Sequence, residues 1–215
     1  MGEVIHDVKN ALTAIRTCAE ILGDDELNAD ERQEFAQMLT REIDRVIGIT
    51  QDLLEFSYGR QETLNIQTCA LKEVLEEILP IIKYSFANQN ITMQTDLQYT
   101  GEVQIDISKM KRVFMNIADN ARDAMPNGGL FTINSRLENN MILLEFIDSG
   151  CGISPELQTR IFDPLVTEGK AHGTGLGMAI VKKILDEHHA QIAIQSVLSQ
   201  GTTIRISLPV PRVNF

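Results

Sequence analysis

A histidine, an acidic neighbour and an amide one helical turn further on stand near the N-terminus, in the stretch His6-Asp7-Val8-Lys9-Asn10. An imidazole nitrogen is nucleophilic only when the other ring nitrogen carries the proton, and an adjacent carboxylate can fix that tautomer and accept the proton. Residues four apart on a helix share a face, so Asn10 lies within reach of a group held at His6. The stretch indicates a nucleophilic histidine, with an exposed His-Asp pair on an ordinary helix as the alternative.

Two amides further along the chain are suited to a cation. Asn116 and Asn120 are one helical turn apart, and a pair of amide oxygens on one face can bind a hard cation such as Mg²⁺ that phosphates share. A pair of asparagines that only packs between helices is the alternative.

A third stretch combines a carboxylate with glycines. Asp148 follows an apolar run and precedes Ser149-Gly150-Cys151-Gly152. Glycines allow the backbone to approach a flat ligand closely, and a carboxylate can accept a hydrogen bond from an adenine amino group. A plain turn of the same composition is the alternative.

A second glycine-rich stretch opens a predicted helix, whose N-terminal N–H groups suit phosphate oxygens. Its residues are Gly173, Thr174, Gly175, Leu176 and Gly177. The two histidines at the far end of that helix, His188 and His189, are expected to answer the helix dipole without taking part in chemistry.

In this order the four stretches resemble the H, N, G1 and G2 boxes of two-component sensor histidine kinases, and residues 161–164 resemble the F box. The resemblance covers nearly the whole chain. It implies that His6 is phosphorylated from ATP, that Asp7 is the general base, and that Asn10 helps a water to dephosphorylate the aspartate of a response-regulator receiver domain.

The same resemblance implies that Asn120 binds Mg²⁺ beside Asn116 and that Asp148 selects adenine. It also implies a lid over the phosphates at residues 165–172, in which Lys170 contacts the terminal phosphate. The N box is shared with gyrase, Hsp90-type chaperones and mismatch-repair ATPases. Position 116 is acidic in the gyrase-like members, so the amide here favours a kinase.

Hydrophobic periodicity gives the elements that must position these residues. Apolar residues at helical spacing over residues 5–22 and 31–57, with Asn28 or Asp30 as a cap between them, predict an antiparallel helical hairpin. One hairpin cannot cover both its apolar faces, so a four-helix bundle in a homodimer is expected. Residues 1–60 are therefore interpreted as a dimerisation and phosphotransfer domain.

Residues 61–215 read as a catalytic domain in which short strands alternate with helices. We expect an α/β sandwich, of the Bergerat ATP-binding type by the resemblance, with helices on one face of a mixed sheet. The predicted helices span residues 71–88, 108–124, 155–162 and 176–188. The predicted strands span residues 64–68, 91–97, 103–105, 130–137, 141–147, 191–196 and 202–208.

Composition limits the classes of partner. A net charge of −11 argues against nucleic acid as a non-specific partner, and no apolar run approaches the ~20 residues of a membrane span. Three cysteines form no metal-type pair and are expected to be free, mostly buried thiols in a cytoplasmic protein. We also expect an upstream sensor region that is absent from this chain.

Two other functions remain open at this point. An ATPase-driven conformational switch would use the same nucleotide residues without a phosphohistidine, and a non-enzymatic scaffold would retain only the fold. Acid-labile phosphohistidine distinguishes the kinase from the switch, and the intact glycines in both loops argue against the scaffold.

Overall fold

The computed structural model describes residues 2–24, 27–57, 63–166 and 175–211, and for residues 2–7, 44–45, 51–57 and 88 it describes the backbone alone. The chain divides into two compact units, residues 1–60 with 164–177 and residues 61–163 with 178–215. The predicted boundary after residue 60 stays a prediction, because residues 164–177 group with the first unit.

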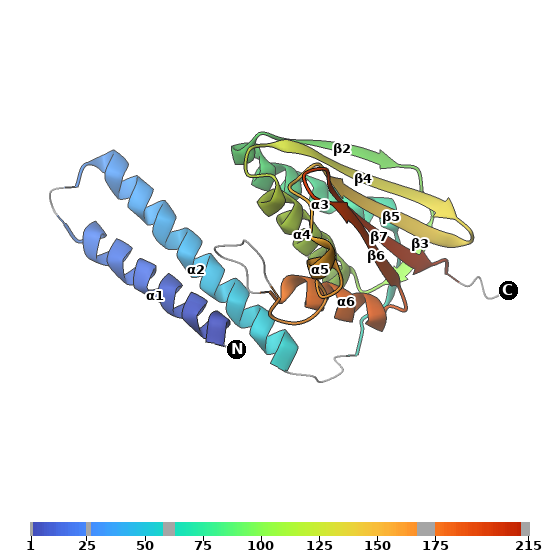
Figure 1. Ribbon diagram of the computed structural model, residues 1–215, viewed down its shortest axis with the longest axis horizontal. Helices are drawn as coiled ribbons and strands as arrows, with labels where there is room; N and C mark the ends of the chain where they lie inside the picture. Colours follow the sequence, from blue (N-terminus) through green and yellow to red (C-terminus); the bar gives the residue numbers. More distant parts are fainter. Residues whose placement is uncertain (1, 25–26, 58–62, 167–174, 212–215) are drawn as a thin grey trace. The chain divides into compact units, whose positions relative to one another are not determined.

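The first unit contains two antiparallel helices, α1 (Gly2–Leu22) and α2 (Ala29–Ser57), as predicted (Figure 1). Asn28 caps α2, because its side-chain oxygen accepts a hydrogen bond from the Glu31 N–H at 3.0 Å. The Asn28 N–H in turn donates to the Glu31 carboxylate at 3.1 Å, so two N–H groups that the helix leaves unpaired are satisfied reciprocally. None of the described helices combines the length and apolar composition that a membrane span needs.

The second unit is built on a mixed sheet with the strand order β2-β4-β5-β7-β6, and a separate pair, β1-β3. The first residue of α6, Gly177, falls just before this unit resumes at residue 178. The elements of the unit are β1 (Gln67–Ala70), α3 (Leu71–Phe86), the 3-10 helix η1 (Ala87–Gln89), β2 (Ile91–Leu97), β3 (Glu102–Ile105), α4 (Ile107–Ala124), β4 (Gly129–Glu138), β5 (Met141–Asp148), α5 (Pro155–Gln158), α6 (Gly177–Glu187), β6 (Gln191–Val197) and β7 (Gly201–Pro209).

Strand pairing accounts for the mixed character of this sheet. Strand β2 runs parallel to β4, whereas β4, β5, β7 and β6 are antiparallel to their neighbours. A two-residue turn joins β4 to β5, and both of its residues, Asn139 and Asn140, have positive φ (49° and 60°). Such turns match the right-handed twist of the paired strands.

The predicted elements are confirmed, apart from one strand and the helix expected at 155–162, which ends at Gln158. The structure has no strand at residues 64–66, and β1 pairs with β3 from Gln67 onward. The Asn65 N–H donates instead to the Asp106 carboxylate at 3.0 Å. This segment is therefore held by a side chain and not by a strand partner.

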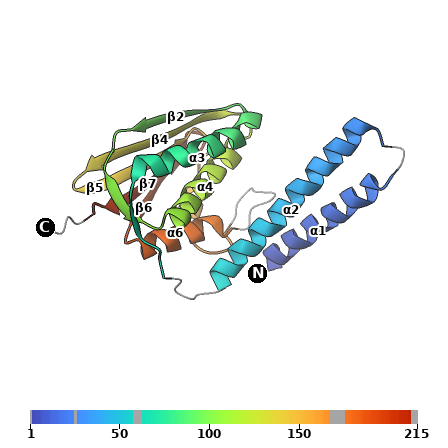
Figure 2. The same ribbon diagram turned by 180° about the vertical axis from the view of Figure 1, so that it is seen from behind.

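The helices lie on one side of the sheet and enclose its core, as the sequence predicts (Figures 1 and 2). Phe86 of α3 meets Phe131 of β4 edge-on, with ring centroids 5.2 Å apart. Phe114 of α4 lies 5.6 Å from Phe146 of β5. Because all four rings are at most 1% exposed, this cluster fixes α3 and α4 against the two strands.

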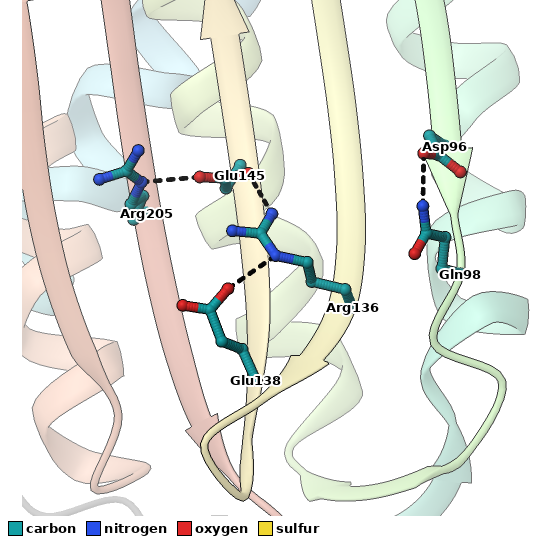
Figure 3. A network of polar contacts seen from close by, with 6 residues as sticks. All are labelled: Asp96, Gln98, Arg136, Glu138, Glu145 and Arg205. Carbon is teal, nitrogen blue, oxygen red and sulfur yellow. Dashed lines mark hydrogen bonds and ion pairs between the residues drawn. The ribbon is translucent and has the colours of Figure 1, made fainter.

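The opposite face of the sheet is polar and centres on Glu145 of β5 (Figure 3). Glu145 is 7% exposed and lies between Arg136 of β4 and Arg205 of β7, whose Nε atom is 2.7 Å from the carboxylate. Burial opposes ionisation of Glu145, but the hydrogen bonds from both arginines outweigh it, so its pKa lies below the ordinary value. Arg136 also pairs with the more exposed Glu138 at 2.8 Å.

Glu145→Gln should lower the free energy of unfolding at pH 7 by about 1–3 kcal/mol, because two guanidinium groups lose a charged acceptor. Urea denaturation would measure this. Because the pKa of Glu145 is lowered in the folded state, its ionised form stabilises the fold at pH values above the ordinary carboxyl pKa. The difference from wild type should therefore vanish as the pH falls through the folded-state pKa. Glu138→Gln is the control, with a loss below about 1 kcal/mol; equal losses would contradict the assignment.

Candidate functional site

The residues of the first motif lie on α1. The backbone of His6 and Asp7 is helical, and their side chains fall outside the described residues. Asn10 is exposed on the same helix, one turn after His6. The helical spacing that the sequence predicts for these residues is thus present.

Asn116 and Asn120 lie in the second half of α4, one turn apart and half-buried. They flank a row of buried residues, Val113, Ile117 and Ala121. The amide nitrogen Nδ2 of Asn116 is buried and, among the described residues, has no hydrogen-bond partner. A buried polar atom without a partner is costly, so this amide is suited to a ligand.

Asp148 is the last residue of β5 and is half-buried. Its Oδ1 atom accepts two backbone hydrogen bonds, from Gly150 N–H at 2.9 Å and Thr202 N–H at 3.2 Å. Burial raises the pKa of Asp148 above its ordinary value, although both N–H donors act in the opposite direction. The carboxylate is therefore held rigidly by one oxygen in a partly dry position.

The loop after Asp148 packs against the C-terminal end of α4. A Cβ atom at Gly150 would lie 2.7 Å from the Ala124 carbonyl oxygen, and the Cys151 N–H donates to that same oxygen at 3.0 Å. Since Ala124 is one turn beyond Asn120, the structure brings the predicted G1 loop and the asparagine helix together. The three cysteines are free as predicted, but the expectation that they are mostly buried is wrong, because Cys18 is buried, Cys69 is half-buried and Cys151 is exposed.

The turn between β6 and β7 supports this loop from the other side. Gly152 has φ +71°, and a Cβ there would lie 2.2 Å from the Val197 carbonyl oxygen. The Ile153 N–H donates to Ser196 Oγ at 2.9 Å. Gly201 packs equally closely on the Asp148 backbone. Ser196, Gly201 and Thr202 were not predicted from the sequence, in which a glycine before a strand was the single available signal.

The second glycine stretch is described from Gly175 onward. Lys170, Gly173 and Thr174 lie outside the described residues. Gly175 has φ +67°, and its carbonyl oxygen accepts a hydrogen bond from the Leu165 N–H at 2.9 Å. Leu176 is fully buried, and α6 begins at Gly177, one residue after the predicted start.

Two protein families match this chain, one over the N-terminal part that carries the first motif and one over the C-terminal part that carries the other motifs. Residues 2–62 match the family described as "His Kinase A (phospho-acceptor) domain". Residues 105–212, half of the chain, match the family described as "Histidine kinase-, DNA gyrase B-, and HSP90-like ATPase". The chain belongs to the sensor histidine kinases. Residues 105–212 correspond to the ATP-binding domain of this family.

Individual relatives agree with this family. Signal transduction histidine-protein kinase AtoS of Escherichia coli is 32% identical over 212 residues, which cover 98% of this chain and 34% of AtoS. The chain thus spans about a third of that kinase. The catalytic domain of histidine kinase ThkA is 27% identical with a TM-score of 0.61, over 67% of this chain and 95% of that domain.

In a crystal structure of ThkA in complex with response regulator protein TrrA, the matched chain shares the fold of this protein with 23% identity and a TM-score of 0.75. The match covers 97% of this chain and 60% of that one. The predicted fold, a helical hairpin followed by an α/β sandwich of the Bergerat type, is therefore confirmed.

Without nucleotide, Asp148→Asn should leave the free energy of unfolding at pH 7 unchanged or raise it. A raised pKa means that ionisation of Asp148 costs stability above the folded-state pKa, whereas an amide oxygen can accept both N–H bonds without charge. Wild type should gain on the variant as the pH falls through that pKa. Urea denaturation at pH 7 and at a pH below the folded-state pKa tests this, with the exposed Asp96→Asn as control. A loss of unfolding free energy above about 1 kcal/mol in Asp148→Asn at pH 7 would contradict the expectation.

Proposed function

We propose that this chain is the catalytic core of an ATP-dependent protein-histidine kinase that phosphorylates His6 and passes the phosphoryl group to an aspartate of a response-regulator receiver domain. One observation carries the proposal: a single chain combines a phospho-acceptor domain around His6 with an ATP-binding domain around Asp148.

The contacts of Asp148 support a role in adenine recognition. Both hydrogen bonds that described residues make to its carboxylate end on Oδ1, and Oδ2 is proposed to accept a hydrogen bond from the adenine amino group. The neighbouring Gly150 and Gly152 let the backbone approach the base. The same Asp148→Asn variant should thus weaken ATP binding by about 1.5–3 kcal/mol even though it does not destabilise the fold.

Asn116 and Asn120 are proposed to hold Mg²⁺ and the phosphates. As oriented, the buried Nδ2 of Asn116 suits a phosphate oxygen; rotation of the amide by half a turn would present its oxygen to a cation. Asn120 supplies a second amide oxygen from the same face. When bound, Mg²⁺ would neutralise charge on the β- and γ-phosphates. Backbone N–H groups of residues 173–177, and Lys170, would bind the remaining phosphate oxygens.

Phosphoryl transfer then follows from the chemistry of the first motif. One imidazole nitrogen of His6 bonds to the γ-phosphorus as the bond to the β–γ bridging oxygen breaks, and ADP leaves. Asp7 accepts the proton from the other ring nitrogen. Asn10, one turn further on, orients a water on the phosphoaspartate of the regulator, which gives a phosphatase activity toward the same partner.

The core is proposed to act as a homodimer through α1 and α2. Four large apolar side chains among the described residues of the hairpin are exposed in the single chain, namely Leu12 (52%), Met38 (40%), Ile43 (41%) and Ile47 (47%). A second hairpin would cover them in a four-helix bundle. By its relation to longer kinases we propose that the core works on the cytoplasmic side of a larger sensor, whose upstream region is not in this chain.

A conformational switch of the gyrase or chaperone type is the alternative function. It would need the nucleotide site without the phospho-acceptor domain that residues 2–62 match. The amide at Asn116, where gyrase-like members have an acid, also disfavours water activation at that position.

His6→Gln should abolish phosphorylation of the chain by γ-labelled ATP and leave ATP binding within about twofold, because the acceptor and the nucleotide residues lie in different domains. The label on wild type should be acid-labile, as a phosphohistidine is. Calorimetry with an ATP analogue provides the binding control. Label at the wild-type level on the variant would refute His6 as the acceptor.

Asn10→Ala should spare phosphorylation of His6 and slow dephosphorylation of the regulator, whereas Asp7→Asn should slow phosphorylation at least about 100-fold by removing the base. Two time courses measure this, one for label entering the kinase and one for label leaving a purified phosphorylated regulator. Equal loss of both activities in both variants would show that the roles are not separable.

A further inference from the structure

A polar cluster outside the nucleotide site, built around two buried side chains, joins three parts of the second unit. Its members are Asn65, Asp106, Lys109, Glu187 and His188. Asp106 and His188 are each 6% exposed. Neither the chemistry of phosphoryl transfer nor the binding of ATP uses any of these side chains directly, yet burying this much polarity is costly unless each group is paired.

Asp106 makes the central contacts of this cluster. It caps α4, because Oδ1 accepts hydrogen bonds from Lys109 N–H at 3.1 Å and Ser108 Oγ at 2.8 Å. Its other oxygen, Oδ2, accepts the Asn65 N–H at 3.0 Å. One carboxylate therefore fixes the start of α4 and, separately, the segment that follows the predicted boundary at residue 60.

His188 connects the end of α6 to the same point. Its Nε2 atom accepts a hydrogen bond from the Asp106 N–H at 2.9 Å, which requires the tautomer with the proton on Nδ1. That Nδ1 lies 2.7 Å from the Ile184 carbonyl oxygen, to which it donates. The expectation that His188 only answers the helix dipole is therefore too limited. An ion pair between Lys109 and Glu187 at 3.5 Å runs alongside.

The two helices that meet at Asp106 also carry residues predicted to bind phosphate and a cation, and these residues lie far from Asp106 along each helix. Asn116 follows Asp106 by ten residues, or about 15 Å along α4, and α6 begins at Gly177, the last residue of the second glycine stretch. A helix transmits a displacement of one end to the other as a rigid body. A change in position at Asn65 would consequently move Asn116 through Asp106.

We propose that Asp106 and His188 are positioning residues that couple the segment around Asn65 to the nucleotide site, so that motion arriving at Asn65 changes ATP affinity. This inference rests on the proposed function. Coupling is reciprocal, so ATP binding must in turn stabilise the contact at Asn65.

Hydrogen exchange of the full chain tests the coupling first. In wild type, saturating ATP should slow exchange of the Asn65 amide by about fivefold or more, the lower range of measured couplings. Amides of residues 116–120 and 148–152 report ATP binding in the same experiment. If those respond and Asn65 does not, this inference is wrong and the proposed function stands; if none responds, both are wrong.

Two pairs of variants test the route. Asp106→Asn retains a capping oxygen but turns an amide N–H₂ toward the Asn65 N–H, and should raise the ATP dissociation constant about fivefold. Ser108→Ala removes one bond to Oδ1, spares the Asn65 contact, and should change it less than twofold. Equal effects of the two variants would show a capping role alone.

The second pair addresses His188. His188→Phe leaves the Asp106 N–H without an acceptor and should match Asp106→Asn in ATP affinity and in the loss of ATP-dependent protection at Asn65. His188→Gln can place an amide oxygen near the position of Nε2 and should restore both toward wild type. Failure of Gln to do better than Phe would remove His188 from the route, and with it the coupling proposed here.

Discussion

The register of β5 at the centre of the sheet is the constraint on which the nucleotide site depends. Side chains alternate along a strand, so Asp148 shares a face with the buried Leu144 and Phe146, while Glu145 points to the opposite face. A slip by one residue would exchange these faces. Packing of Phe146 against Phe114 of α4 excludes that slip. It thereby keeps the Asp148 carboxylate on the face of the sheet that the helices cover.

The two carboxylates of β5 show how one strand provides opposite electrostatic environments. Glu145 has two arginine partners and a lowered pKa, whereas the partners of Asp148 among the described residues are backbone N–H groups and its pKa is raised. The first arrangement stabilises the sheet. The second leaves a charge incompletely paired in a partly dry position, which is unfavourable for the fold and favourable for recognising a hydrogen-bond donor. The difference between the residues therefore separates a structural role from a binding role.

Local pattern was sufficient for most of the fold and for part of the site. Helical spacing predicted α1, α2 and α4, and alternation or apolar runs predicted the strands of the main sheet. The sequence motifs also pointed to Asp148, Gly150 and Gly152. The partners of Asp148 could not be found in this way, since Thr202 is 54 residues away and contributes a backbone N–H that every residue type except proline would supply.

Contacts between residues far apart in the sequence also account for the other predictions that were wrong. Residues 64–66 have the composition of a strand, but the Asp106 carboxylate takes the Asn65 N–H, a contact across 41 residues. His188 sits at a helix end where a dipole interaction is the local expectation, and its bond to Asp106 spans 82 residues. Cys151 has the weak polarity of a buried thiol, yet it is exposed in a loop whose backbone is held by the bond from its N–H to the Ala124 carbonyl oxygen. Each error involves a long-range polar contact that periodicity does not encode.

The parallel pairing of β2 with β4 has a consequence for the order of folding. The β4–β5 and β6–β7 hairpins close through short turns and can form early, at little cost in loop entropy. Strand β2 reaches β4 only after β3 and α4 have been traversed, so the contact is non-local and its closure is slower. An edge strand that docks late leaves the side of β4 unpaired in the meantime, and that exposed edge is where association between partly folded chains would begin.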